Sequence, residues 1–424
     1  MMLRFLSGPA LLILISCSPS TETPENGTRA NQTHQSEATT EPTALADYLF
    51  VWARDKEGEQ TDFFSVFNVD PESEQYGQLV STVPMGVVAN AHHTEHFMSE
   101  GNRLFMNGFM TGNSFVVNVT DPQVPVVDAH FTNAGPYTYP HSFERLPNGN
   151  VLATFHNKGA PDSGAGGLVE LDPLGKFLRG TDAADAVDPE LRPYSLAPVP
   201  NLDRVVTTTG DMWLKLLGRS IQIWRLSDLT LMKTVLLPPG PRGDENLDVA
   251  EARLLDDGRT LIVTTFRCGM YVLSNIETDI PAIDFVYSFP FESFEAGDEC
   301  GLPWRIGRYW IQTVQKTNSL HVLDISDPRR PQLVSELFLG RDELPHWISG
   351  DLGGNRIALT GSGPWLDGRV VLLELNQTTG NLSVIDDFRS PGFDRPGANM
   401  NRETWPHGDN GPAVPHGVVF SRPN

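Results

Sequence analysis

Hydrophobic and polar residues follow one repeated pattern along this chain of 424 residues. A short β-branched or apolar run leads to a turn rich in Asp, Asn, Pro or Gly, and a second apolar run follows. Residues 114–127, SFVVNVTDPQVPVV, and residues 319–334, SLHVLDISDPRRPQLV, are the clearest copies. Weaker copies begin at Phe63, Gly166, Ser220, Gly269 and Arg369, which gives a period of about 50 residues.

A second series of strand, turn and strand lies between the copies of the first. Its members begin at His93, His141, Tyr194, Glu251, Cys300, His346 and His416. Two strand pairs per repeat make a four-stranded blade, and seven blades make a β-propeller. The last member has one strand, while residues 46–83 supply strands that lack an inner partner. We therefore predict an all-β, seven-bladed β-propeller over residues 45–424, closed by pairing of the N- and C-terminal strands. An open solenoid is the alternative, and a split blade fits it less well.

The first 44 residues have a different composition. Residues 1–17 contain one Arg and a short apolar run, and they end in Leu-Ile-Ser-Cys, which resembles the bacterial lipobox. We expect a lipoprotein signal peptide over residues 1–17 with lipidation of Cys17; an ordinary signal peptide with a chance Cys is the alternative. Residues 18–44 are polar and predict a disordered tether. The expected location is the bacterial cell envelope, facing the periplasm and touching the membrane only through the lipid.

Composition and motifs exclude several classes of function. The formal charge of −22 argues against nucleic-acid binding, which requires clustered Lys and Arg. The sequence contains no P-loop, no GxGxxG after a strand, no HExxH and no GxSxG, so the common nucleotide, zinc-protease and hydrolase motifs are missing. Apart from Cys17, the cysteines are Cys268 and Cys300. They could pair in an oxidising compartment, but the sequence does not decide this.

Histidines stand where the inner strands are expected to begin. In a propeller the first strand of each blade lines the central channel, so these starting residues converge on one mouth. We expect a metal site formed by His92, His93, His141, His346 and His416, because neutral imidazole suits copper, zinc and iron. Hydrogen-bonded core histidines are the alternative. Successive strand residues point to opposite faces, so His92 and His93 face the channel together only if the segment bends.

Further residues are expected near the same mouth. Tyr194 and Glu251 are the candidates for catalysis, and a carboxylate at Glu251 would orient an imidazole N–H. The additional candidates for the site are His96, His156, Cys300 and His407. Other histidines, such as His130 and His321, fall on outer strands and are expected to be structural.

Six motifs stand in a fixed order from about residue 47 to the C-terminus: FSVFNVDPESEQYGQLVSTVPM, HHTEHF, GLVELD, VAEARLL, LDISDPRRPQLVSELFLG and PAVPHG. This ordered set resembles the selenium-binding protein family, whose members include methanethiol oxidase. The resemblance implies a copper-dependent oxidase that takes a small thiol and O2, converting methanethiol, O2 and water to formaldehyde, hydrogen sulfide and hydrogen peroxide. It places the family's histidines on His92, His93, His141 and His416, and its glutamate on Glu251.

Three positions depart from the family's pattern. The selenium-linked Cys is Gly77 here, so selenium binding through that residue is not expected. One family His falls near Thr317, where His346 would have to substitute, and the Trp of the His-His-x-x-Trp pattern is His96. The residues themselves leave two other functions open. One is a non-catalytic propeller lipoprotein that binds a ligand or a partner protein at the mouth, and the other is a periplasmic copper carrier without turnover.

Overall fold

The structure of the protein is a computed structural model. It describes residues 44–161, 164–187, 191–213, 218–290, 300–341, 343–361 and 368–423. The expected signal peptide, the lipidation site Cys17 and nearly all of the expected tether lie outside the described residues and stay predictions. In the described part of the chain, no helix has the length and hydrophobicity that crossing a bilayer requires. Its helices are two single turns, η1 (Phe109–Thr111) and η2 (Pro200–Leu202).

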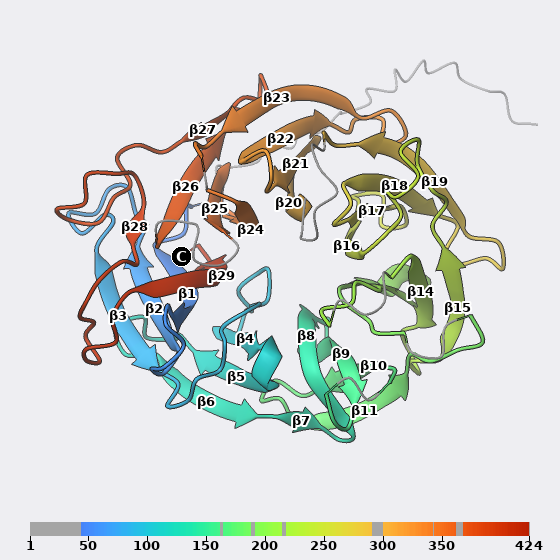
Figure 1. The fold of residues 1–424 in the computed structure, drawn as a ribbon, viewed down its shortest axis with the longest axis horizontal. Helices are drawn as coiled ribbons and strands as arrows, with labels where there is room; N and C mark the ends of the chain where they lie inside the picture. Colours follow the sequence, from blue (N-terminus) through green and yellow to red (C-terminus); the bar gives the residue numbers. More distant parts are fainter. Residues whose placement is uncertain are drawn as a thin grey trace, which may run out of the picture. The chain divides into compact units, whose positions relative to one another are not determined.

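Strands of the described chain form seven sheets arranged in a ring, the blades of a β-propeller (Figure 1). From the centre outward, blade one contains β29 (Ala413–Phe420), β1 (Tyr48–Asp55), β2 (Phe63–Asn68) and β3 (Leu79–Pro84). Blade two contains β4 (Arg103–Gly108), β5 (Asn113–Asn118) and β6 (Val126–Phe131). Blade three contains β8 (Tyr137–Arg145), β9 (Val151–Lys158), β10 (Gly167–Leu171) and β11 (Phe177–Asp182), with β7 (Asn133–Ala134) paired to β8.

The other four blades repeat the four-stranded order. Blade four contains β12 (Leu196–Val199), β13 (Arg204–Thr208), β14 (Ser220–Arg225) and β15 (Leu231–Leu236). Blade five contains β16 (Val249–Leu254), β17 (Leu261–Thr265), β18 (Gly269–Ser274) and β19 (Ala282–Ser288). Blade six contains β20 (Cys300–Ile306), β21 (Tyr309–Val314), β22 (Ser319–Asp324) and β23 (Gln332–Phe338). Blade seven contains β24 (Pro345–Gly350), β25 (Arg356–Gly361), β26 (Arg369–Leu375) and β27 (Leu382–Val384), with β28 (Ala398–Asn399) paired to β26.

Both ends of the described chain meet in blade one, as the sequence predicted. The last strand, β29, pairs antiparallel with β1, and Leu49 lies opposite Phe420. The register shifts between Val51 and Ala53, where a β-bulge lets the long inner strand follow the curve of the blade. This pairing completes blade one with strands from both ends of the described chain and closes the ring, so the seven-bladed propeller prediction is confirmed.

Blade two departs from the expected pattern because its innermost strand is missing. The segment of residues 92–96, expected to begin that strand, runs beside β4 but forms a single bridge, between Thr94 and Met106. Backbone hydrogen bonds join it to β4 at His92 N–Asn107 O (2.9 Å) and Glu95 N–Phe105 O (3.0 Å). The segment is therefore held in place by hydrogen bonds, but its side chains need not alternate between two faces as they do in a regular strand.

Apolar side chains pack mainly between neighbouring blades. Strands β21 and β25 are buried at every position, whereas β6 on the rim alternates between exposed and half-buried residues. One apolar cluster joins Met270 of blade five to Trp310 of blade six. Full burial of one large apolar side chain contributes roughly 1.5–3 kcal/mol, so these interfaces fix the blades and hold the inner strands in place.

Candidate metal centre

Histidines from four blades gather along the inner strands: His346 lies near the start of β24, while His141 and His416 lie near the middle of β8 and β29. His92, His93 and His416 each offer one ring nitrogen, and these three atoms lie within 4.8 Å of one another. The ring centroid of His141, on β8, is 4.3 Å from that of His93. The ring of His346, on β24, is at the edge of the group, 5.0 Å from that of His416. The structure thus brings together the five histidines that the sequence placed at the mouth, while their role as ligands stays a prediction.

Two consecutive histidines reach the same cluster because their segment is not a regular strand. The rings of His92 and His93 stack with centroids 4.1 Å apart and planes 9° apart. Just before them, Asn90 has a φ of 60°, in the left-handed region that an Asn tolerates better than most residues. This irregular backbone supplies the bend that the sequence required if both imidazoles were to face the centre.

Burial keeps these imidazoles neutral. Loss of hydration is the main cause that lowers the pKa of His92, His93, His141 and His416 well below the usual range, and neighbouring imidazoles lower it further. Burial also lowers the pKa of His346 to about 4. A neutral imidazole keeps the nitrogen lone pair that binds a transition metal.

Several ring nitrogens in the cluster have no hydrogen-bond partner among the described residues. They are His92 Nδ1, His93 Nε2, His141 Nε2 and His416 Nδ1, and all four are buried. A buried polar atom without a partner costs about 1–3 kcal/mol, so a structural role alone does not explain four of them in one place. A metal ion with imidazole ligands would satisfy them, and these residues therefore fit a copper or similar transition-metal centre.

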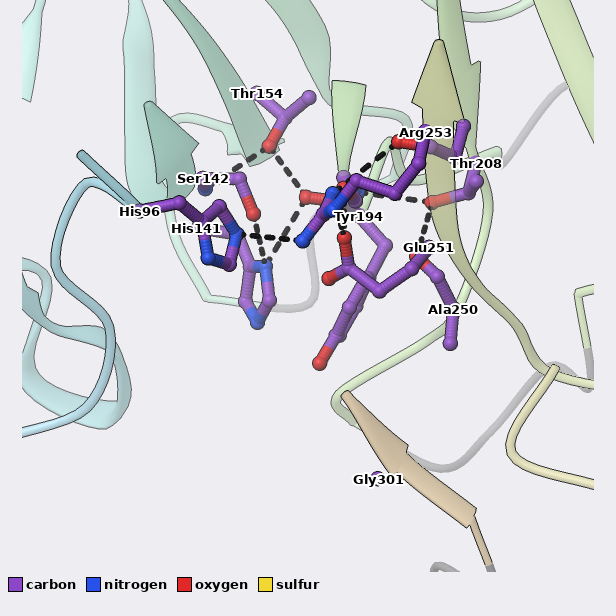
Figure 2. A network of polar contacts seen from close by, with 12 residues as sticks. His96, His141, Ser142, Thr154, Tyr194, Thr208, Ala250, Glu251, Arg253 and Gly301 are labelled. Atoms are coloured by element: carbon purple, nitrogen blue, oxygen red, sulfur yellow. Dashed lines mark hydrogen bonds and ion pairs between the residues drawn. The ribbon is translucent and has the colours of Figure 1, made fainter. Parts of the chain in front are cut away.

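The orientation of His141 is set by its other ring nitrogen. Figure 2 shows its Nδ1 beside the backbone carbonyl of Tyr194, at 3.0 Å, and beside Ser142 Oγ, at 3.1 Å. Because a carbonyl only accepts, Nδ1 carries the proton and Nε2 keeps the lone pair. Metal-binding histidines in proteins are commonly oriented in this way. Tyr194 thus acts on His141 through its backbone, and its ring packs 3.8 Å from the imidazole.

Asn107 of β4 is a central positioning residue that the sequence analysis did not identify. Its side chain accepts from the backbone N–H of His93 (2.8 Å) and donates to the carbonyls of Pro140 (2.5 Å) and His141 (2.9 Å). It is fully buried, and its own carbonyl accepts from the Trp52 indole. One amide therefore ties together the two chain segments that carry His92, His93 and His141.

Glu251 has other hydrogen-bond partners than the imidazole that the sequence analysis suggested. In the described structure, no hydrogen bond joins its carboxylate to an imidazole. Glu251 instead accepts from Ser195 Oγ (2.7 Å). It also forms an ion pair with Arg253 (2.5 Å), which Figure 2 shows. Burial, the largest cause, raises the pKa of this fully buried carboxyl. Among the described residues, Glu251 is linked to a histidine through Arg253, which reaches His96.

His96 is not placed as a metal ligand. Arg253 Nη2 lies 2.9 Å from His96 Nε2, and since a guanidinium only donates, that nitrogen accepts and Nδ1 carries the proton. The ring stacks on Trp347 with centroids 4.7 Å apart, and the Trp347 ring lies at the same distance from that of His93. His96 therefore contacts the cluster through an indole rather than directly.

The remaining additional candidates have different positions. His156 is fully buried behind His141, with ring centroids 5.2 Å apart, and burial lowers its pKa to about 3. His407 lies elsewhere, against Phe63 and with Nδ1 2.7 Å from Thr82 Oγ1, so it does not join the cluster. Cys300 forms a disulfide with Cys268, which answers the question of pairing and removes Cys300 as a thiolate ligand.

Two departures from the family pattern have a local structural context. Gly77 has a φ of 78°, and a Cβ at this position would lie 2.1 Å from the backbone oxygen of Arg389. A cysteine there would require the backbone to move. The Thr317 hydroxyl lies 2.6 Å from Ser319 Oγ, while the nearby Gln315 amide lies 2.7 Å from His346 Nδ1 and fixes that ring.

Sequence comparison finds relatives of one kind. No family model matches the chain. A methanethiol oxidase of Hyphomicrobium is 26% identical over 246 residues, which cover 51% of this chain and 54% of the relative. A methanethiol oxidase of Ruegeria pomeroyi is 26% identical over 156 residues, or 35% of each chain. The matched region thus spans about half the length of the first relative and about a third of the second.

Solved structures support the fold. A hypothetical selenium-binding protein from Sulfolobus tokodaii has a TM-score of 0.72 and 16% identity, covering 89% of this chain and 94% of that one. A periplasmic gluconolactonase of Pseudomonas aeruginosa has a TM-score of 0.60 and 12% identity, covering 90% of this chain and 100% of that one. At 16% and 12% identity, both likenesses are of fold alone. Together with this likeness of fold, the methanethiol oxidase matches support placing the chain as a distant member of the selenium-binding protein family.

Proposed function

We propose that the protein is a copper-dependent oxidase of small thiols, with methanethiol, O2 and water going to formaldehyde, hydrogen sulfide and hydrogen peroxide. The observation that carries the proposal is the group of four buried imidazole nitrogens without hydrogen-bond partners among the described residues. The methanethiol oxidase relatives support the choice of substrate class. His92, His93, His141 and His416 would hold the metal, with His346 at the edge of the group.

The protein's own residues would keep the centre dry and oriented. Phe109 and Trp347 are fully buried and pack against the histidines, Phe109 5.4 Å from His141 and Trp347 4.7 Å from His93. Aromatic rings make favourable contacts with sulfur, so this surrounding suits a small apolar thiol. Copper, when bound, supplies the one-electron redox chemistry that the reaction between a thiol and dioxygen requires.

Metal content tests the proposal first. Residues 45–424 would be produced in a copper-supplied periplasm beside a His93→Ala/His141→Ala double variant, and both would be analysed by plasma mass spectrometry. We expect about one copper per chain, lost in the variant, and peroxide release when methanethiol is added. Copper without peroxide would favour a carrier, and protein that takes up no metal would leave a propeller that binds another ligand or a partner protein.

We also propose that Cys17 carries lipid and that the propeller faces an oxidising compartment of the cell envelope. The Cys268–Cys300 disulfide supports this, because disulfides persist mainly outside reducing cytoplasm. Full-length protein should appear in the membrane fraction, and Cys17→Ser should release it. Membrane association that survives Cys17→Ser would argue against lipid anchoring at this residue.

A further inference from the structure

The inner strands also line cavities that lie away from the histidine cluster. Two cavities, of about 240 Å³ and 760 Å³, share the lining residues His96, Phe97, Glu144 and Pro198. On β8, Glu144 is three residues beyond His141, about 10 Å at the usual rise of a strand. The five histidines of the candidate metal centre line neither cavity.

Charged side chains of both signs line the smaller cavity. Glu144, Arg253 and Arg305 line it, and in the described residues no ion pair joins Glu144 to either arginine. Arg253 pairs with Glu251, and Arg305 pairs with Asp256. Arg253 is held in place from behind by Glu251 and by His96 Nε2, at 2.5 Å and 2.9 Å (Figure 2). The carboxylate of Glu144 has no hydrogen-bond partner in the described structure.

An unpaired carboxylate in this position is poorly stabilised. Burial is the main cause that raises the pKa of Glu144 to about 8; Arg253 lowers it, and Glu95 and Glu251 raise it. A cation placed against Glu144 would favour its charged form. His96 adds a second unsatisfied group, because its Nδ1 is buried and lacks a partner among the described residues. Since Nε2 accepts from Arg253, Nδ1–H remains available as a donor.

The walls of the smaller cavity are apolar. The rings of Phe97 and Trp304 lie 5.0 Å apart, and Phe97 is 44% exposed. The other apolar residues of the lining are Leu196, Ala197, Pro198, Ala252 and Leu254. A cavity of about 240 Å³ is below the usual size for drug-like ligands and suits a molecule as small as an amino acid.

We propose that the smaller cavity binds a small zwitterion with one amine and one carboxylate, the size of an aliphatic amino acid. The ammonium group lies against Glu144, the carboxylate against Arg253, and the aliphatic part against Phe97 and Trp304. A ligand of this class gives the unpaired Glu144 carboxylate a cation and adds an acceptor for the Arg253 guanidinium, which Glu251 already holds in place; a simple cation or anion supplies only one of the two. The site needs neither the metal nor the proposed oxidase activity.

Binding of matched probes to metal-free full chain tests this inference by isothermal titration calorimetry. The probes are L-valine, isobutylamine, which lacks the carboxylate, and isovalerate, which lacks the amine. We expect valine to bind at least about tenfold more tightly than either partial probe. If isobutylamine binds as tightly as valine, the cavity is a cation site, and if isovalerate does, it is an anion site. If valine does not bind up to about 10 mM, the cavity is not a binding site. Each of these outcomes overturns the proposal.

Two variants test whether Glu144 is responsible for valine binding. Glu144→Gln keeps the side chain's size and removes its charge, so valine affinity should fall about tenfold. Glu100→Gln is the matched control, because Glu100 is 91% exposed and lines only the larger cavity. Thermal melting of both variants checks the fold. Unchanged valine affinity in folded Glu144→Gln would contradict the proposal. Failure of the protein to bind copper or to oxidise thiols would not contradict it, because the titration uses neither property.

Discussion

Single buried residues decide how the histidines are presented, and Asn107 shows this most directly. We predict that Asn107→Ala lowers copper affinity about 10- to 100-fold, because residues that orient ligands contribute on that scale. The variant leaves the His93 N–H and the Pro140 and His141 carbonyls without this partner. Competition with a chromophoric copper chelator gives the affinity.

A matched control separates positioning from general damage in that experiment. Asn113→Ala removes an amide of the same size that bonds to Thr111 and His130 on the blade rim, and it should leave copper affinity unchanged. Folded Asn107→Ala with normal copper affinity would show that the hydrogen bonds of Asn107 do not position the ligands.

Asp62 holds the backbone just before His92 and His93 through a hydrogen bond to its titratable carboxyl group. Its Oδ2 accepts from Ala91 N at 2.6 Å, and burial raises its pKa from 3.8 to about 7. Between these values the folded state binds the proton and the unfolded state does not, so this group's contribution to stability falls as the pH rises from about 4 to 7. We predict that Asp62→Asn stabilises the protein at pH 8 relative to wild type, by up to about 4 kcal/mol.

Denaturant unfolding at pH 8 and pH 5 measures that difference. Asn keeps the side chain's size and its acceptor for Ala91, so the gain should shrink at pH 5, where Asp62 is protonated in the folded state. An equal effect of the substitution at both pH values would show that the carboxyl is not buried in its neutral form.

The residues of the site could be predicted from sequence where a repeat fixed their position. The residues that they contact could not be predicted. His141, His346 and His416 could be found because their positions on the inner strands recur with the blade period. The pairing of His96 with Arg253 could not, because the two residues are 157 positions apart and meet only across the ring. No local signal marks such a pair.

At the scale of the element, blade two and the disulfide show what patterns miss. The sequence predicts a strand beginning at His93, yet hydrogen bonds to β4 and the Asn107 side chain hold residues 92–96 as an irregular segment. Tertiary contacts override the local β-propensity of the segment here. The pairing of Cys268 with Cys300 was left open because spacing alone does not determine connectivity.

The Cys268–Cys300 disulfide joins the β17–β18 turn of blade five to the first residue of blade six. Closing a loop across 32 positions stabilises by about 3–4 kcal/mol in the chain-entropy picture. We predict that Cys268→Ser/Cys300→Ser lowers stability by roughly that amount and leaves copper content unchanged. Denaturant unfolding and metal analysis of the same sample test both halves, and loss of copper from the folded variant would contradict the second.

At the scale of the whole molecule, closure of the ring places the histidines together. The split blade was readable from sequence because the C-terminal strand lacks partners while residues 46–83 lack an inner strand. The repeat period does not predict how far along an inner strand a residue lies. This position along the strand separates the histidine cluster from the cavities around Glu144. That separation arises from side-chain packing inside the ring, to which Trp347 and Phe97 contribute.

The buried histidines also make the stability of the metal-free protein depend on acid. Burial lowers the pKa of His346 from 6.5 to about 4, so below pH 6.5 the unfolded state binds a proton that the folded state does not. This group's contribution to stability is present above pH 6.5 and is lost as the pH falls toward 4. Asp62 and Glu144, whose pKa values are raised, act in the opposite direction, so total stability alone does not isolate the histidine.

A comparison of metal-free wild type with His346→Gln isolates it. Gln cannot titrate, so the variant should lose less stability than wild type between pH 7 and pH 4.5, by about 2 kcal/mol. Denaturant unfolding at both pH values gives the difference. A variant whose stability falls as steeply as that of wild type would show that His346 takes up its proton in the folded state as readily as in water. The inner strands would then not exclude solvent from the histidine cluster, and the neutral, desolvated set of ligands on which the copper proposal depends would not exist.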